Sequence, residues 1–285
     1  MVNIIWIILV LFAVWFIYIF ATDVLKNKNN LENVSWIKTG LIGFVVNFFD
    51  VLGIGAFAPQ TALLKFTKQT SDKLIPGTMN VANTIPVLIQ AIIFIKVIEV
   101  EPTTMVVMFL TAMCGAFIGA DIIAKLSENK IRITMSIALM ITAGFMLANK
   151  LHWIQGDGVA IGIHGWKLVL AGAVNFILGA MMTAGVGLYA PCMALVFLLG
   201  LSPQVAFPIM MGSCAFLMPL ASYKFIKSGA YNKKAAVGMA IPSIVAVLIA
   251  ALIVKSLPLD TLRWLVLFII VYTSITMFWS AVKNK

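Results

Sequence analysis

Charged residues are scarce in this sequence, and so are the residues that build metal and redox sites. Only 11% of the 285 residues are charged, and the chain contains three cysteines and two histidines. The cysteines (Cys114, Cys192 and Cys214) lie singly in apolar segments, without the spacing of a disulfide framework or a zinc site. The histidines, His152 and His164, share one polar stretch, and the sequence contains no His-Glu-x-x-His. We therefore expect no metal site, no cofactor and no enzymatic activity built on these groups.

Polar stretches are short as well. The two longest run from Asp23 to Lys38 and from Lys150 to Lys167, which leaves no room for a separate soluble domain. Hydrophobic residues make up 62% of the chain, more than a soluble domain of this length could bury. The sequence therefore predicts an all-α, polytopic membrane protein that forms a single membrane domain over residues 1–285.

Apolar segments long enough to enter a bilayer follow one another along the chain. They cover residues 3–21, 36–66, 75–98, 103–124, 131–149, 166–200, 203–227, 235–254 and 259–282. The first has no basic region before it and no small-residue cleavage site after it, so we expect a retained transmembrane helix. The net charge of +10 comes from basic residues at segment ends, which the positive-inside rule explains without a nucleic-acid partner.

Two of these segments contain the same break. The first reads Gly53-Ile-Gly-Ala-Phe-Ala-Pro59, and the second reads Gly185-Val-Gly-Leu-Tyr-Ala-Pro191. Alignment of the two breaks divides the chain into an extra N-terminal helix and loop (1–30), a first repeat (36–150) and a second repeat (166–285). Each repeat is predicted to contain one broken segment followed by three transmembrane helices.

The basic residues predict how the broken segments run. If each broken segment enters the membrane and returns to the same side, few of the 20 lysines and arginines lie outside: Lys96, Lys150, Lys167, Lys255 and Arg263. If every segment crosses instead, the charge bias is weak. Re-entrant hairpins leave three full spans per repeat, and this odd number inverts the second repeat relative to the first. We expect the N-terminus outside and the C-terminus in the cytoplasm.

The paired breaks mark the predicted substrate site. Lipid cannot satisfy the backbone groups freed by such a break, so protein or a water-filled cavity must receive them, and paired breaks point to a transporter's binding site. Pro59 and Pro191 fit the first turn of a returning half-helix, whose N-terminus attracts anions. Two such N-termini meeting near the midplane would form a pocket for a small anion. The alternative is that the glycines only allow close helix packing.

Polar groups near the breaks could contact the substrate or only bond neighbouring helices. The predicted substrate-binding residues are Gly53, Ile54, Gly55, Ala56, Pro59, Gln60, Asn80, Asn83, Gly185, Gly187, Tyr189, Pro191, Cys192 and Ser213. Asp50 lies three positions before the first break, and an intramembrane carboxylate is a functional candidate by default. We interpret Asp50 as the candidate for coupling to protons; a helix cap or a partner for a backbone amide is the alternative. Asp121 has the spacing of an interfacial ion pair with Lys125.

The motif residues resemble the sulfite exporter TauE/SafE family of membrane permeases, also called the TSUP family. The resemblance rests on Gly53, Gly55, Pro59, Gly77, Thr78, Gly115–Ala120, Gly185, Gly187, Pro191 and Leu199-Gly-Leu-Ser-Pro203. Ala56 and Leu188 stand where the family has a third glycine, and Met210-Met211 stands where it has Gly-Thr. The resemblance implies export of sulfite, a sulfonate or another sulfur-containing organic anion from a bacterial cell, coupled to protons.

The predicted function is therefore that of a secondary transporter that works by alternating access in the bacterial cell membrane. No Gly-x-x-x-x-Gly-Lys motif for ATP is present. The expected partners are a small anion, protons as the coupling ion and membrane lipid, and a homodimer is left open. The alternatives are an importer, an exporter of a non-sulfur anion, or a membrane partner protein without transport of its own. A central cavity that reaches both breaks would argue against the last of these.

Overall fold

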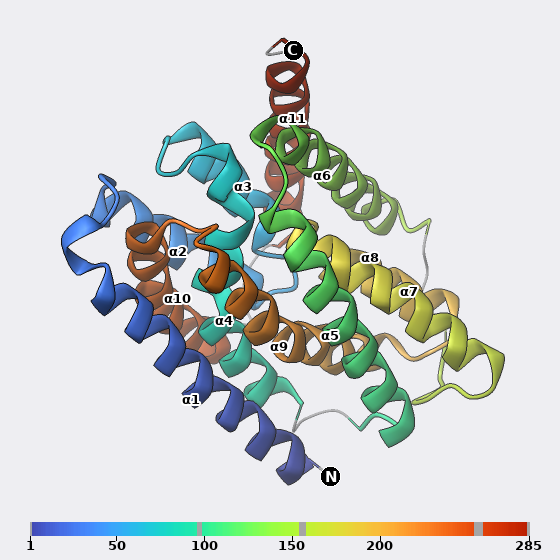
Figure 1. Ribbon diagram of the computed structural model, residues 1–285. Helices are drawn as coiled ribbons and strands as arrows, with labels where there is room; N and C mark the ends of the chain where they lie inside the picture. The colour runs from blue at the N-terminus through green and yellow to red at the C-terminus, as the bar shows by residue number, and fades with distance from the viewer. Residues whose placement is uncertain (1, 96–98, 154–157, 254–258, 284–285) are drawn as a thin grey trace.

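The computed structural model describes residues 2–95, 99–153, 158–253 and 259–283, which form helices joined by short loops (Figure 1). The helices are α1 (Val2–Lys26), α2 (Trp36–Asp50), α3 (Phe57–Phe66), α4 (Ile75–Phe94), α5 (Pro102–Ala124), α6 (Glu128–Lys150), α7 (Trp166–Thr183), α8 (Tyr189–Leu198), α9 (Pro203–Ser228), α10 (Lys233–Ile253) and α11 (Leu259–Lys283). Two short 3₁₀ helices, η1 (Lys28–Asn30) and η2 (Asp72–Leu74), lie between them. The all-α prediction is confirmed.

Most of these helices are long enough to cross a membrane. Within the described residues, seven stretches combine sufficient length with sufficient apolarity: Asn3–Lys26, Asp72–Phe94, Pro102–Ala124, Glu128–Ala148, Trp166–Thr183, Gln204–Ser228 and Lys233–Leu252. The chain is therefore a multi-pass membrane protein. Three basic residues used in the topology argument, Lys96, Lys255 and Lys285, lie outside the described residues.

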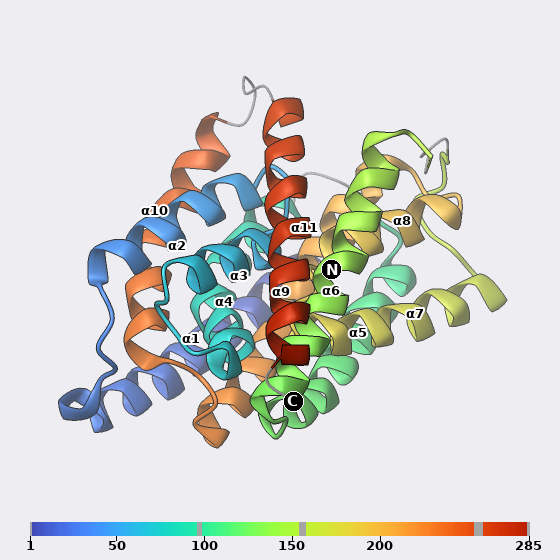
Figure 2. The ribbon, with the colours of Figure 1, turned by 90° about the horizontal axis from the view of Figure 1, so that it is seen from above.

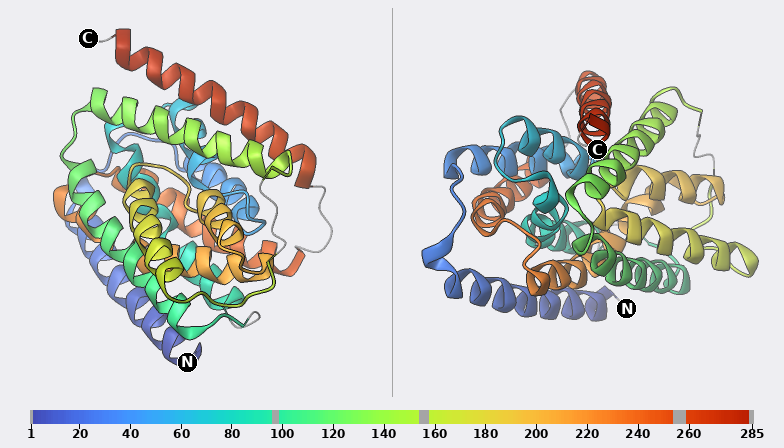
Figure 3. Two further views of the ribbon diagram at one scale, coloured as in Figure 1. Left: turned by 90° about the vertical axis from the view of Figure 1, so that its right-hand side faces the viewer. Right: turned by 45° about the horizontal axis from the view of Figure 1, so that its top comes forward.

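The helices pack around a central pair, α4 and α9, which are the most deeply buried of the membrane-span candidates. Helices α2 and α10 cover one side of this pair, and α5 and α7 cover the other (Figures 1 and 2). Helices α6 and α11 lie side by side along one edge of the molecule, while α1 lies along the opposite edge against α9 and α4 (Figure 3). Much of the surface of α1 is apolar and exposed, as expected of a helix that faces lipid.

The helix contacts follow the same pattern in both halves of the chain. Helix α2 packs on α10 as α7 packs on α5, and α4 packs on α10 as α9 packs on α5. Helix α3 contacts α11 as α8 contacts α6, while the α4–α9 and α6–α11 pairs join equivalent helices. Two halves related by a twofold axis would produce this pattern. Helix α1, which the sequence analysis placed outside the duplication, has no counterpart in it.

Glycines hold the paired helices in backbone contact. A Cβ atom added at Gly115 of α5 would lie 1.9 Å from the Phe176 carbonyl oxygen of α7, and one at Gly179 of α7 would lie 2.2 Å from the Ala112 carbonyl oxygen of α5. On the other side of the molecule, Gly43 of α2 approaches the backbone of α10 in the same way. Small residues commonly bring membrane helices together like this. Glycines within the helices therefore have a close-packing role in both halves of the molecule.

Replacing Gly115 by leucine is expected to prevent α5 and α7 from packing, because the side chain would occupy the position of a backbone carbonyl. The substitution should lower the free energy of unfolding by at least the ~1–3 kcal/mol that overpacking of a core costs. The measurement is the yield and melting temperature of monodisperse protein in detergent. Gly144→Leu on α6 is the control, since no atom lies within 4 Å of a Cβ at Gly144. Equal yields and melting temperatures for the two variants would contradict the prediction.

Asp121 corrects one sequence-based interpretation. Its carboxylate lies 2.5 Å from the ammonium of Lys224 on α9, so the ion pair joins two helices. The same ammonium lies 3.9 Å from the centroid of the Phe117 ring. Lys125, the partner expected from the spacing, is the C-cap of α5. The expectation was wrong because it considered one helix alone, whereas α9 packs directly on α5.

Candidate functional site

The two breaks interrupt their helices at equivalent places. Helix α2 ends at Asp50 and α3 begins at Phe57, while α7 ends at Thr183 and α8 begins at Tyr189. In the first break Gly53 and Gly55 have φ values of 79° and 90°, and in the second Gly185 has a φ of 100°. Only glycine adopts such left-handed conformations without strain. Gly187 is not left-handed, and no atom lies within 4 Å of a Cβ added there, so neither its backbone nor its packing requires glycine.

Each break ends in the first turn of a short helix, as the sequence predicts. Pro59 and Pro191 are the third residues of α3 and α8. The residues before these helices, Ala56 and Leu188, make no side-chain capping hydrogen bond. The first backbone N–H groups of a helix have no partner within it, so each half-helix directs free donors and the positive end of its dipole toward the break.

The two breaks meet at the centre of the molecule and share two small cavities. The first cavity is lined by Asp50, Gly55, Ala56, Phe57, Val87, Met182, Gly187, Leu188, Tyr189 and Cys214. The second is lined by Ile54, Gly55, Ala58, Thr142, Gly187, Tyr189 and Ala190. Gly55, Gly187 and Tyr189 line both cavities, so one glycine of each break lies at the shared wall. A central space that reaches both breaks is the feature that argues for transport.

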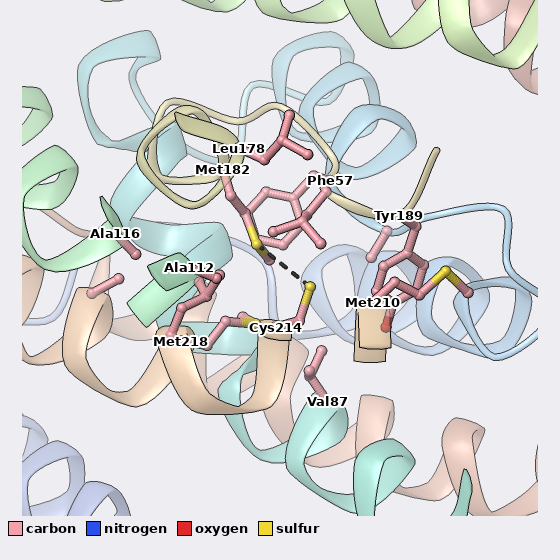
Figure 4. Packing of buried hydrophobic residues seen from close by; sticks show 14 of the residues in the cluster. Phe57, Val87, Ala112, Ala116, Leu178, Met182, Tyr189, Met210, Cys214 and Met218 are labelled. Atoms are coloured by element: carbon pink, nitrogen blue, oxygen red, sulfur yellow. Dashed lines mark hydrogen bonds between the residues drawn. The ribbon is translucent and has the colours of Figure 1, made fainter. Parts of the chain in front are cut away.

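Both cavities are narrow. Each cavity has a volume of about 10 Å³. This is enough space for about one water molecule. Much of the wall of the first is apolar: Figure 4 shows Phe57, Met182 and Cys214 gathered near Tyr189, with the two sulfur atoms 3.6 Å apart. The structure is therefore closed around the breaks, with room for little more than a water molecule between them.

A chain of hydrogen bonds crosses from one half to the other beside the first cavity. Gln90 of α4 donates from Nε2 to the Asp50 carboxylate at 2.8 Å, and its Oε1 accepts from the Tyr189 hydroxyl at 3.1 Å. The backbone N–H of Ala56 and the Tyr189 hydroxyl also interact with the Asp50 carboxylate. The carboxylate of Asp50 therefore lies next to the N-terminus of α3. At the matching position of the second half, three residues before Gly185, stands Met182, a neutral residue that lines the same cavity.

A second polar network joins α2 to α4 and α10. Asn47 donates to Asn83 at 3.0 Å and to Ser243 at 2.9 Å, while Asn83 donates to Gln60. The other half contains a similar contact, in which Asn175 of α7 donates to Ser213 of α9 at 3.1 Å. These side chains are buried, and none of them lines the two cavities.

The structure thus divides the predicted site residues into groups. Five of the predicted binding residues line a cavity, together with the coupling candidate Asp50: Ile54, Gly55, Ala56, Gly187 and Tyr189. Four others shape the breaks and the first turns: Gly53, Pro59, Gly185 and Pro191. The remaining ones are buried away from the two cavities: Gln60, Asn80, Asn83, Cys192 and Ser213. Asn80 donates to the Pro76 carbonyl one turn earlier.

Gln90 was missed by the sequence analysis. It lies seven residues after Asn83, or two helical turns along the same face of α4, and this spacing was the signal that could have revealed it. Cys214, which follows the predicted residue Ser213 in the sequence, also lines a cavity and was not among the predicted site residues. Lining residues such as Met182 and Thr142 carry no sequence signal, because apolar residues and threonine are common throughout membrane helices.

Two motif residues in the first half have a packing role. The Thr78 hydroxyl accepts a hydrogen bond from the backbone N–H of Asn232 at 2.9 Å, and a Cβ at Gly77 would lie 2.1 Å from the Ala230 carbonyl oxygen. The start of α4 thus receives the loop between α9 and α10. This loop belongs to the second half, so its contacts with Gly77 and Thr78 join the two halves at a distance from the cavities.

Comparison with protein families matches residues 2–146 to the family described as sulfite exporter TauE/SafE. The match includes α1, which the resemblance seen in the sequence did not cover, and ends within α6. It therefore contains the first break, Asp50 and Gln90. No curated protein and no solved structure was found to match the chain. With half of its length matched, the chain belongs to the TauE/SafE family of membrane transporters of sulfur-containing anions.

Proposed function

We propose that the protein exports a small sulfur-containing anion, sulfite or a sulfonate, by alternating access coupled to protons. The observation that carries this proposal is the meeting of the two breaks, since Gly55 and Gly187 line the same two cavities from opposite halves. Polar backbone groups are exposed at both breaks, at a depth where lipid could not satisfy them. A membrane partner protein without transport would have no use for such a space.

The two half-helices offer the anion unequal sites. The Asp50 carboxylate already interacts with the Ala56 N–H of the first break, and it opposes a second negative charge there. At the matching position before the second break, three residues before Gly185, stands the neutral Met182. The first amides of α8 and the Tyr189 hydroxyl are therefore the main donors in this proposal. The anion would bind on the α8 side, with Gly187 leaving room for it.

The proposed movement follows from the paired contacts. Each half contributes one broken helix, one central helix and two packing partners, and the contacts of one half repeat in the other. Two inverted repeats with similar contacts can exchange their conformations, which opens the central space first to one side and then to the other. The narrow cavities fit a closed state between these two.

The proposed orientation places the N-terminus outside and the C-terminus in the cytoplasm of a bacterium, with the broken helices as re-entrant hairpins. Helices α3 and α8 have ten residues each, too few to cross a bilayer. Helix α7 has 18 residues, so its length alone is compatible either with a full span or with one arm of a re-entrant hairpin. In this orientation most basic residues face the cytoplasm, where they raise the local concentration of anions to be exported.

The test is transport in proteoliposomes that contain the purified protein. Efflux and uptake of radiolabelled sulfite and of a sulfonate such as isethionate are measured with and without a proton gradient. We expect flux of at least one anion, accelerated by the gradient and absent from liposomes without protein. Equal flux with and without the proton gradient would contradict proton coupling. Lack of any flux of sulfur anions by folded protein would contradict the substrate class and direct the test to small carboxylates.

A further inference from the structure

Gln90 occupies a position that nothing so far explains. It is completely buried, and it joins a carboxylate of the first half to a phenol of the second (Asp50 and Tyr189, 2% and 5% exposed). Both of these partners line the first cavity, whereas Gln90 does not. The amide therefore lies behind the substrate site and contacts both groups that would sense a proton or an anion within it.

An amide side chain carries its donor and its acceptor at opposite positions of one plane, so its orientation decides what each neighbour must do. With Asp50 ionised, the carboxylate only accepts, and Gln90 presents Nε2 to it. Oε1 then faces Tyr189 and accepts from its hydroxyl, which is the arrangement in the structure. In this state the Tyr189 hydroxyl donates to Gln90, and it also interacts with the Asp50 carboxylate beside it.

Protonation of Asp50 reverses these requirements. The carboxyl group becomes a donor, and Gln90 satisfies it by turning its amide by half a turn so that Oε1 accepts from it. Nε2 then faces the oxygen of Tyr189, so the Tyr189 hydroxyl hydrogen has lost Gln90 as its acceptor. The carboxyl group of Asp50 beside it is now neutral and accepts more weakly than a carboxylate does. A buried donor without a good acceptor is costly, and the cavity that Tyr189 lines is the place where a bound anion can accept from it.

We propose that Gln90 is a positioning residue that couples the proton on Asp50 to anion binding by Tyr189. The inference rests on the proposed function and adds a mechanism to it. Protonation of Asp50 then raises the affinity for the anion, and by linkage the bound anion raises the affinity for the proton by the same factor. The two are therefore carried together. The titratable groups that interact with Asp50 among the described residues are Tyr189 of α8 and Cys214 of α9, while α3 contributes the Ala56 amide and α4 the neutral Gln90.

A simpler coupling would need no amide, because the negative charge of Asp50 alone repels an anion. The two mechanisms differ in how Tyr189 behaves. Under charge repulsion alone, removing the Tyr189 hydroxyl weakens anion binding equally at every pH. With the Gln90 switch, the hydroxyl contributes to binding only when Asp50 is protonated, so the cost of Tyr189→Phe depends on pH.

The first experiment measures the dissociation constant for isethionate, which remains a monoanion from acidic to alkaline pH. We expect Tyr189→Phe to weaken binding by about tenfold at acidic pH and to have almost no effect at alkaline pH. The Gln90→Met variant keeps the side-chain volume and removes the amide. In this background, Tyr189→Phe should weaken isethionate binding by the same factor at both pH values. In an Asp50→Asn background, which removes the titrating group, the weakening caused by Tyr189→Phe should likewise be the same at acidic and alkaline pH. A cost of Tyr189→Phe that does not vary with pH in otherwise wild-type protein would overturn the proposal.

The second experiment requires no substrate, so it separates failure of the switch from failure of the proposed function. Infrared difference spectra between acidic and alkaline pH are recorded for the empty protein, with Tyr272→Phe, an exposed tyrosine on α11, as the control. We expect a carboxylic-acid signal that Asp50→Asn removes, accompanied by a tyrosine signal that Tyr189→Phe and Gln90→Met remove. A tyrosine signal that survives Gln90→Met would overturn the switch. Its loss in Gln90→Met together with absent isethionate binding would support the switch and contradict the substrate class.

Discussion

Replacing Gly187 by leucine is expected to reduce transport to the level of empty liposomes and to leave the amount of folded protein unchanged. Gly187 lines both cavities, so a leucine side chain would fill the space between the two breaks. No atom lies within 4 Å of a Cβ at this position, and its backbone is not left-handed, so the first atom of the side chain meets no backbone or neighbour. The measurement is anion flux per folded transporter in proteoliposomes, with folding checked by size-exclusion chromatography.

The control is Gly144→Leu on α6, a glycine that is equally free of near neighbours but does not line either cavity. It should transport normally. Gly55→Leu should also abolish transport, but its φ of 90° strains any larger residue, so its loss of flux would combine two causes. Normal flux by both Gly187→Leu and Gly55→Leu would remove the anion site from between the breaks.

The sequence predicted the breaks correctly because they violate a strong physical rule. Glycines and a proline within an apolar segment leave backbone groups that a bilayer cannot satisfy, and the structure interrupts both helices there. The second break at a matching position supports the same interpretation independently, because paired breaks indicate a transporter's binding site. The meeting of Gly55 with Gly187 agrees with this reasoning, although the residues are far apart in sequence.

The contacts between helices could not be predicted in the same way. Asp121 reaches Lys224 rather than Lys125 because α9 packs on α5, and a pattern within one helix carries no information about its neighbour. Asn83 has the spacing of a site residue, yet it bonds Asn47 and Gln60 away from the cavities. Buried polar side chains in membrane helices need partners whether or not a substrate is near, so polarity alone does not distinguish the two roles.

Asp50→Asn is expected to uncouple transport from the proton gradient. The carboxyl group of Asp50 lines the first cavity and is almost completely buried, so its charge state bears directly on an anion bound there. Asparagine keeps the shape and removes the charge, which imitates the protonated carboxyl group. Anion exchange should therefore continue with a flat pH profile, while a proton gradient should no longer accelerate net efflux. The measurement compares exchange and net efflux of isethionate at acidic and alkaline pH.

Asp121→Asn is the matched control, because Asp121 is a carboxylate that pairs with Lys224 at a distance from the cavities. It should keep the pH profile and the response to the gradient. An unchanged pH profile in Asp50→Asn would leave Asp50 as a cap for the first break, held by the Ala56 amide and Gln90. Loss of both exchange and net efflux in folded Asp50→Asn would instead mean that the ionised carboxylate is needed to hold the break in shape. Retained exchange with lost gradient response is the outcome that only a proton-carrying residue produces, because it separates movement of the anion from the energy that drives it.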